Sequence, residues 1–263
     1  ITTTTMPIAV CDSGLRRTHE DITGNLWTNP GEIAGNGIDD DGNGYVDDTQ
    51  GWDFYFNDND PNDGNGHGTH VAGTIGAKGN NSKGVTGVNW NCKLVSLRIA
   101  NASGSISSSA AISAINYCVA KGIKVSNHSW GGGAYSQSMF NTISAARTAG
   151  HLVIAAAGNG GADGIGDNND SIPQYPASYN LDNIISVAAV DNDGNLASFS
   201  NFGATSVDLA APGVLIASCY STNNTSYVYL DGTSMATPHV TGVAALVWTR
   251  YPSWTYSQVR SRI

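Results

Sequence analysis

Ser234 has the local sequence of a nucleophile. It follows Gly232 and Thr233 and precedes a long apolar run, a pattern that predicts a tight turn leading into a helix. At the start of a helix, free backbone N–H groups and the positive end of the helix dipole lie beside the hydroxyl, and both stabilise a developing oxyanion. The alternative is a simple helix cap, which is the commoner role of a serine in a Gly-Thr-Ser turn.

A serine hydroxyl becomes a good nucleophile when a base removes its proton, and that base needs an acid to orient it. His67 lies among small residues in a Gly-His-Gly-Thr-His segment, and Asp12 ends an apolar run. Taken singly, His67 is equally a metal ligand or a core histidine, and Asp12 is more often a turn residue. Asn159 follows another apolar run, and its amide suits an oxyanion. Together with Ser234 they predict acyl transfer.

The chain alternates strand and helix patterns, which predicts a mostly parallel sheet with helices on both faces. Six short runs indicate strands, and several of them are nearly continuous in apolar residues, as strands covered on both faces should be; they lie at 6–11, 94–99, 123–126, 152–157, 184–190 and 207–210. Helical patterns lie at 67–77, 107–120, 137–149, 234–250 and 255–263. Because active groups collect at the carboxyl ends of parallel strands, we expect Asp12 and Asn159 at one edge of the sheet.

Composition excludes several classes of partner. The 263 residues carry a formal net charge of −9, which argues against nucleic acid and anionic membrane surfaces. There is also no apolar run of about 20 residues that would cross a bilayer. The four cysteines match no zinc spacing, and we expect buried free thiols. Disulfides, including one between Cys92 and Cys118, are the alternative.

With these motifs in place, the chain resembles the subtilisin family of serine proteases. The segments around Asp12, His67 and Ser234 match the family's three signatures in the family's order. The resemblance implies a three-layer α/β fold with a twisted, mostly parallel sheet, and a serine endopeptidase that acts through an acyl-enzyme. Ser234 attacks, His67 transfers protons, Asp12 orients His67, and Asn159 holds the oxyanion. We also expect one peptidase domain over residues 1–263, shortened at both ends, and a secreted monomer acting on proteins or peptides.

The resemblance further implies a substrate-binding segment around residues 127–132. The expected subsite residues are Ser129, Trp130 and Gly131, with Ala157 and Gly158 as the opposite wall. Core packing is the alternative for Trp130. A roomy apolar pocket here favours large uncharged side chains at P1. A cis peptide bond is expected before Pro176.

Residues 36–65 contain nine aspartates and no Lys or Arg, which indicates a site for a hard cation. We expect Ca²⁺, because so many close carboxylates repel one another without a cation; a solvated acidic turn is the alternative. The expected ligands are Asp39, Asp41, Asn43, the carbonyl of Tyr45, and Asp48. Asp58 and Asp60 are candidates for a second site. By resemblance to the family's calcium loop, Asp21 and Asn81 form a third, and Asp208 lies near a weaker one.

Two other functions are alternatives to proteolysis. A catalytically silent relative that binds peptides is expected to lack one of the four catalytic residues, and all four are present. A peptide ligase or macrocyclase is expected to carry changes that exclude water from the acyl-enzyme. No insertion near His67 or Ser234 indicates such changes.

Overall fold

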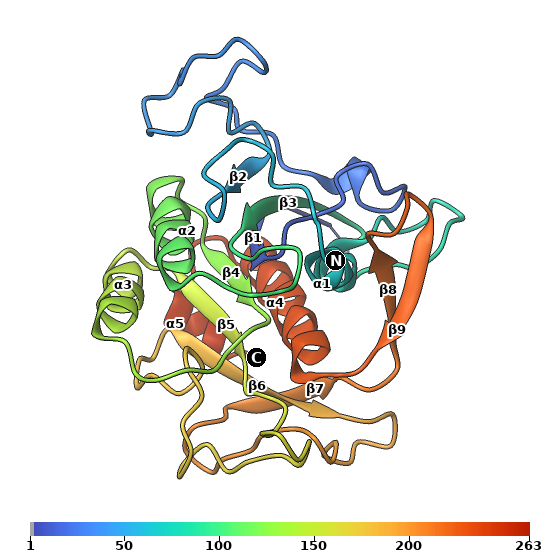
Figure 1. The fold of residues 1–263 in the computed structure, drawn as a ribbon, viewed down its shortest axis with the longest axis vertical. Coiled ribbons are helices and arrows are strands. Elements are labelled where there is room, and N and C mark those ends of the chain that lie inside the picture. The colour runs from blue at the N-terminus through green and yellow to red at the C-terminus, as the bar shows by residue number, and fades with distance from the viewer. Residues whose placement is uncertain (1–2) are drawn as a thin grey trace.

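The computed structural model describes residues 3–263 and is built around a seven-stranded sheet (Figure 1). The strand order is β2-β3-β1-β4-β5-β6-β7, and every neighbouring pair is parallel. The strands are β1 (Thr3–Asp12), β2 (Gly51–Asp53), β3 (Asn91–Arg98), β4 (Val125–His128), β5 (Leu152–Ala156), β6 (Ile184–Val190) and β7 (Leu209–Pro212). A separate antiparallel hairpin is formed by β8 (Ile216–Tyr220) and β9 (Ser226–Leu230).

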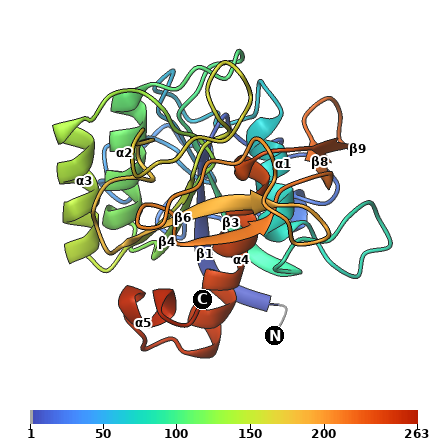
Figure 2. The same cartoon turned by 90° about the horizontal axis from the view of Figure 1, so that it is seen from below.

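Helices cover both faces of this sheet. The helices are α1 (His67–Gly76), α2 (Ser108–Ala120), α3 (Gln137–Thr148), α4 (Thr233–Arg250) and α5 (Tyr256–Arg260), with a short 3₁₀ turn at Thr23–Asn25. Figures 1 and 2 show α2 and α3 on one side of the strands and α1 and α4 on the other. The predicted three-layer α/β class is therefore confirmed.

Side chains of β1 alternate between two separate apolar cores. Ile8 and Val10 pack with α1 and α4, whereas Ala9 and Cys11 pack with α2 and α3. A strand residue points to the face opposite its neighbour, so a strand covered on both sides needs apolar residues at every position. This explains the continuous apolar run that ends at Asp12. None of the helices in residues 3–263 has the length and apolar character needed to cross a membrane.

The sequence patterns located the main strands and helices to within a few residues and missed three short strands. The strand expected at 207–210 lies two residues later, as β7. β2 has only three residues and lies inside the acidic block. In β8 and β9, apolar and polar residues alternate too little to give the pattern of a sheet with one face in solvent.

The four cysteines are buried free thiols, as expected. Cys92 lies in the core beside α1 and α4, whereas Cys118 lies in the core beside α2 and α3. The sheet stands between them, so the alternative of a Cys92–Cys118 disulfide is wrong. The peptide bond between Tyr175 and Pro176 is cis, as the resemblance implied.

Candidate active site

Four separate elements bring the predicted catalytic residues to the carboxyl edge of the sheet. Asp12 is the last residue of β1, His67 is the first of α1, and Ser234 is the second of α4. Asn159 follows the end of β5 by three residues. Asp12 is only 4% exposed, whereas His67 and Ser234 are half-buried and Asn159 is exposed. The acid is thus shielded from water, and the groups expected to meet a substrate are open to it.

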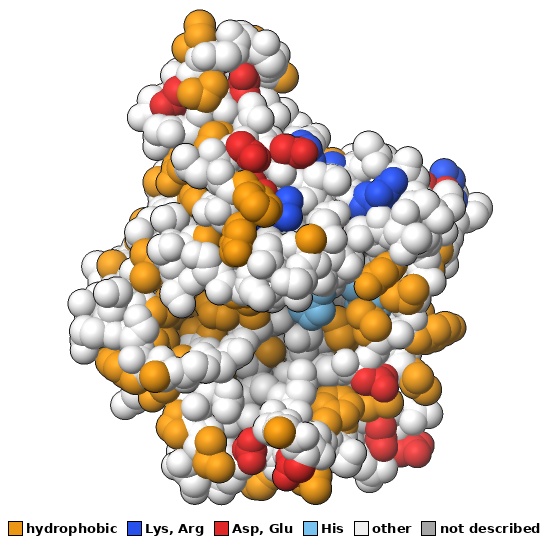
Figure 3. All heavy atoms as spheres, viewed as in Figure 1, with side chains coloured by type: hydrophobic (Ala, Val, Ile, Leu, Met, Phe, Trp, Pro, Cys, Tyr) orange, Lys and Arg blue, Asp and Glu red, His pale blue; other side chains and the backbone are white. Residues whose placement is uncertain are grey.

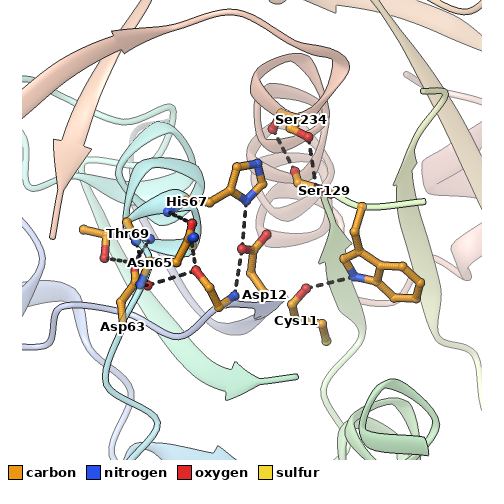
Figure 4. Close-up of polar contacts among 12 residues, drawn as sticks. Cys11, Asp12, Asp63, Asn65, His67, Thr69, Ser129 and Ser234 are labelled. Atoms are coloured by element: carbon orange, nitrogen blue, oxygen red, sulfur yellow. Dashed lines mark hydrogen bonds and ion pairs between the residues drawn. The ribbon is translucent and has the colours of Figure 1, made fainter. Parts of the chain in front are cut away.

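His67 is held by Asp12 in a defined tautomer (Figure 4). The ring nitrogen Nδ1 lies 2.8 Å from Asp12 Oδ1, which also accepts the backbone N–H of Ser13 at 2.8 Å. Because a carboxylate only accepts, Nδ1 carries the proton and Nε2 keeps its lone pair. Burial lowers the pKa of His67, but the negative charges of Asp12 and Asp63 outweigh it and raise that pKa overall.

The hydroxyl of Ser234 donates to the backbone carbonyl of Ser129 at 3.0 Å (Figure 4) rather than to His67. In return, the hydroxyl of Ser129 donates to the carbonyl of Ser234 at 2.8 Å. Pro238 explains the second bond, because a proline has no N–H to give to the carbonyl four residues earlier in the helix. A change of the Ser234 side-chain rotamer, which takes picoseconds to nanoseconds at exposed positions, releases the hydroxyl from Ser129.

Asn159 is fixed through its oxygen, which leaves its N–H groups free. Its Oδ1 accepts both the backbone N–H and the hydroxyl of Thr233 at 2.8 Å. A Cβ placed on Gly232 would lie 3.5 Å from Asn159 Nδ2 and 3.6 Å from the backbone nitrogen of Ser234. Two donors therefore flank one small space beside Gly232, whose φ of 151° suits a residue without a side chain. A pair of donors of this kind can hold an oxyanion.

The five predicted subsite residues extend from two neighbouring strands, β4 and β5. Ser129 and Ala157 are buried, Trp130 and Gly158 are half-buried, and Gly131 is exposed. A Cβ on Gly131 would lie 3.8 Å from the carbonyl of Ala156, so the two segments face each other closely. Three of the five are alanine or glycine, and none is charged.

Trp130 lies on the His67 side of the site. Its indole N–H donates to the carbonyl of Cys11 at 3.0 Å, and its ring borders a cavity of about 320 Å³. Asp12, His67 and Ile106 line the same cavity. Figure 3 shows histidine exposed at the middle of this face, beside a hollow. The segment from Ala100 to Ile106 carries no motif, so only the fold reveals its place at the site.

The acidic block forms one tight carboxylate group, but with a different membership from the predicted one. Oxygens of Glu32, Asp39 and Asp41 lie within 4.8 Å of one another. Glu32 precedes the aspartate-rich stretch and was missed for that reason. The carboxylate of Asp48 is instead buried against the Tyr117 hydroxyl at 2.6 Å and two asparagine amides. Asn43 is also engaged, since its oxygen accepts the N–H of Tyr45 at 2.7 Å.

The other candidate cation ligands fall into two groups. Asp21 and Asn81 lie together, with Asn81 Nδ2 donating to Asp21 Oδ1 at 2.6 Å. Asp58 and Asp60 do not converge: Asp60 pairs with Arg17, and the exposed Asp58 accepts the Asp60 N–H at 2.9 Å. Asp208, the candidate near a weaker cation site, forms an ion pair with Arg260.

Comparison with known proteins places this geometry in one family. Residues 4–263 match Peptidase_S8, the subtilase family. Subtilisin DY of Bacillus licheniformis is 45% identical over 201 residues, covering 76% of this chain and 70% of that protein. Thermitase of Thermoactinomyces vulgaris is 38% identical over 240 residues, covering 91% and 74%. A crystal structure of a cold-adapted subtilisin-like serine proteinase superposes with a TM-score of 0.76 at 32% identity, covering 97% of this chain and 80% of that one. The chain belongs to the subtilase family and is a subtilisin-type serine endopeptidase, a hydrolase that acts on peptide bonds.

Proposed function

We propose that the chain cleaves peptide bonds through an acyl-enzyme on Ser234, with His67 as the base. The 2.8 Å bond between His67 Nδ1 and Asp12 carries the proposal, because it leaves Nε2 as a proton acceptor on the side open to substrate. In the first step Ser234 Oγ bonds to the carbonyl carbon and its proton moves to His67 Nε2. Asp12 stays ionised and stabilises the imidazolium that forms.

The tetrahedral intermediate would be held by the two donors beside Gly232. Its oxyanion accepts from Asn159 Nδ2 and from the Ser234 backbone N–H. When the C–N bond breaks, His67 gives its proton to the leaving amine. Water then repeats the sequence on the ester: its proton goes to His67, its oxygen bonds to the acyl carbon, and Ser234 regains a proton as the acid leaves.

We infer a preference for large uncharged P1 side chains. Support comes from the five subsite residues, none of which carries a charge and three of which are alanine or glycine. Trp130 and Ile106 add apolar surface to the cavity beside His67. Profiling cleavage of a peptide library tests this: a dominant Lys, Arg, Asp or Glu at P1 would contradict it.

The proposed reaction is tested against its alternatives with casein and a sulfonyl fluoride. We expect casein hydrolysis that stops when the reagent labels Ser234. Labelling of Ser234 without any hydrolysis would indicate acyl transfer to an acceptor other than water. Neither labelling nor hydrolysis would indicate a peptide-binding protein without catalysis.

We also propose that Ca²⁺ stabilises the chain at the Glu32, Asp39 and Asp41 group. Three carboxylates with converging oxygens are hard ligands, the kind that Ca²⁺ prefers. Asp21 and Asn81 form a second candidate with one carboxylate in place of three, and the buried Asp21 already accepts Asn81, Val85 and Tyr227. A cation at the first group must likewise displace the Lys121 ammonium that pairs with Asp41. Asp48, Asp58 and Asp60 do not fit a shared cation. Calcium would contribute structure, with no part in the proton transfers.

Three further properties are proposals of the same kind: a single peptidase domain, a monomer, and secretion. The family match over residues 4–263 and the one sheet that joins β1 to β7 support a single domain. Sedimentation velocity at micromolar concentration tests the monomer; a species of twice the mass of 27.3 kDa would contradict it.

A further inference from the structure

A buried carboxylate outside the predicted triad, that of Asp63, accepts five hydrogen bonds (Figure 4). Asp63 is 6% exposed. Its Oδ1 accepts from the Ser13 hydroxyl and from the backbone N–H groups of Asn65 and Gly66, each at 2.9 Å. Its Oδ2 accepts from the backbone N–H of Thr69 at 2.9 Å and from the Thr69 hydroxyl at 2.5 Å. All the hydrogen-bonding groups around it are donors.

The two hydroxyls that donate to Asp63 also accept hydrogen bonds from backbone groups that are far away in the sequence. Ser13 Oγ accepts the N–H of Gly68 at 2.9 Å, and Thr69 Oγ1 accepts the N–H of Arg16 at 2.9 Å. Asp63 thereby ties the segment that follows Asp12 to the first turn of α1, which begins with His67. The two segments are more than 50 residues apart, and the seven-stranded sheet does not join them. A pair of backbone bonds links Leu15 to Pro61 and Asp63, and the side-chain bonds of Asp63 extend this link to the first turn of α1.

We propose that Asp63 is a positioning residue for the triad: it holds Asp12 and His67 in register and keeps a second negative charge beside the imidazole. This inference rests on the proposed function of His67 as the base. Asp63 itself touches neither the substrate-binding segment nor Ser234, so it acts through the two residues that it places.

In addition to its hydrogen bonds, Asp63 acts on His67 through its negative charge. Three titratable groups face His67: Asp12 from β1, Asp63 from the loop before α1, and His70 from α1 itself. Burial lowers the pKa of His70 to about 4, so His70 is neutral at working pH. Asp12 and Asp63 both raise the pKa of His67. Removal of the Asp63 charge should therefore lower it.

An amide of the same shape cannot replace this carboxylate. In Asp63→Asn one oxygen becomes an NH₂ group, which must face either the backbone N–H of Thr69 or those of Asn65 and Gly66. Two donors facing each other leave both unsatisfied in a buried site. The first turn of α1 is then expected to shift relative to β1.

The test compares Asp63→Asn with Asp170→Asn. Asp170 also accepts two hydroxyls and three backbone N–H groups, from Ala204, Thr205 and Ser206, but lies in another loop and is exposed. Hydrolysis of a peptide anilide is measured from pH 5 to 10. In Asp63→Asn we expect the acidic limb of kcat/KM to move to lower pH and kcat on the plateau to fall by up to about a hundredfold. Asp170→Asn should leave the limb in place.

A second readout does not depend on hydrolysis. The His67 ring is titrated by NMR in Ser234→Ala protein with and without Asp63→Asn, and its signal is assigned by its loss in His67→Ala. We expect the lower pKa in the Asp63→Asn protein. If that shift appears but the wild-type chain cleaves no peptide, the proposed function fails, and only the effect of the Asp63 charge on His67 stands. If cleavage is normal and neither the limb, the plateau nor the titration changes, the inference fails alone.

Ser13→Ala covers the case in which Asp63→Asn does not fold. This variant keeps the charge of Asp63 and removes one of its donors together with the link to Gly68. We expect a lower kcat with an unmoved acidic limb, because position changes and charge does not. A wild-type kcat in folded Ser13→Ala would contradict the positioning role.

Discussion

At the scale of the residue, Ser129 makes a stabilising contact that its place in the proposed substrate-binding segment does not reveal. Its hydroxyl donates to the carbonyl of Ser234, which Pro238 leaves without a helical partner. The sequence shows Pro238 inside a helical pattern, but not which side chain from another strand compensates for it. The folded chain supplies that partner from the residue after β4, and the same contact holds the Ser234 backbone beside the proposed substrate-binding segment.

Ser129→Ala should therefore destabilise the protein. The part-buried carbonyl of Ser234 loses its partner, which costs about 1–3 kcal/mol of unfolding free energy. Urea denaturation measures the loss, with Ser138→Ala, an exposed serine of α3, as the matched control that changes stability by less than about 0.5 kcal/mol. Equal stability of the two variants would contradict this account of the contact.

Asn159→Ala should lower kcat by about 10²–10³ with little change in KM, the loss known for subtilisin itself when its oxyanion amide is removed. The reason is that Thr233 binds Oδ1, which leaves Nδ2 to donate to the oxyanion of the transition state. Steady-state kinetics on a peptide substrate measure it, and Asn141→Ala, an exposed asparagine of α3, is the control. A raised KM with unchanged kcat would mean that the amide binds substrate and transition state equally.

At the scale of the element, a chain of hydrogen bonds among buried polar side chains joins β4 to the residue before β5. His151 Nδ1 donates to the carbonyl of Ile123 at 2.7 Å, so its Nε2 accepts the hydroxyl of Ser126 at 2.7 Å. Ser126 Oγ then accepts from His128 Nε2 at 2.7 Å, which leaves His128 Nδ1 as a buried acceptor with no partner among the described residues. His151 must be neutral for this chain of bonds to hold, because its Nε2 accepts. A proton on His128 Nδ1 would place a buried charge without a partner.

Stability should fall as the pH falls below about 6.5, the ordinary histidine value in an unfolded chain. Burial lowers the pKa of His128 to about 3 and that of His151 to about 4. Between about pH 6.5 and 4 the unfolded state therefore binds protons that the folded state does not, and unfolding becomes easier. His128→Leu should show a smaller loss between pH 8 and pH 5 in urea denaturation of Ser234→Ala protein. Parallel pH curves for the two proteins would contradict this.

The elements that the sequence predicts well are those buried on both faces. β5 is a continuous apolar run, β1 is apolar from Met6 to Cys11, and β6 is apolar except for Ser186. The long α4 follows a clear turn. The hairpin of β8 and β9 was missed because its residues are mostly half-exposed and its pairing depends on contact with α1. Local pattern carries little information where a neighbouring element decides the structure.

At the scale of the whole molecule, the acidic loop projects from the body beyond β2 (Figure 1). The sequence patterns predicted a cation site here. Which carboxylates form that site depends on how the loop folds, because only some of them face one another. Glu32 joins Asp39 and Asp41, whereas Asp48 turns inward to Tyr117. Spacing along the chain does not encode that difference. The same limit applies to Asp63 and to the segment from Ala100 to Ile106, whose roles appear only in the fold.

Removal of calcium should lower the melting temperature. A ligand at a hundredfold excess over its Kd stabilises by about 2.7 kcal/mol, which is about 5–10 °C for a chain of this size. Differential scanning calorimetry in EDTA and after Ca²⁺ is restored measures the change in Ser234→Ala protein. Glu32→Gln should reduce the difference, and Asp193→Asn, an exposed acid in another loop, should not. No difference between EDTA and Ca²⁺ would contradict the proposed site.

The central claim, that Ser234 is the nucleophile and His67 its base, is tested most directly by mass spectrometry after treatment with a sulfonyl fluoride. We predict one adduct on Ser234 in the wild-type chain with complete loss of peptide hydrolysis. We predict no adduct in Ser234→Ala and much slower labelling in His67→Ala, with both variants inactive. An adduct on another residue with loss of activity, or hydrolysis that persists in Ser234→Ala, would contradict the account.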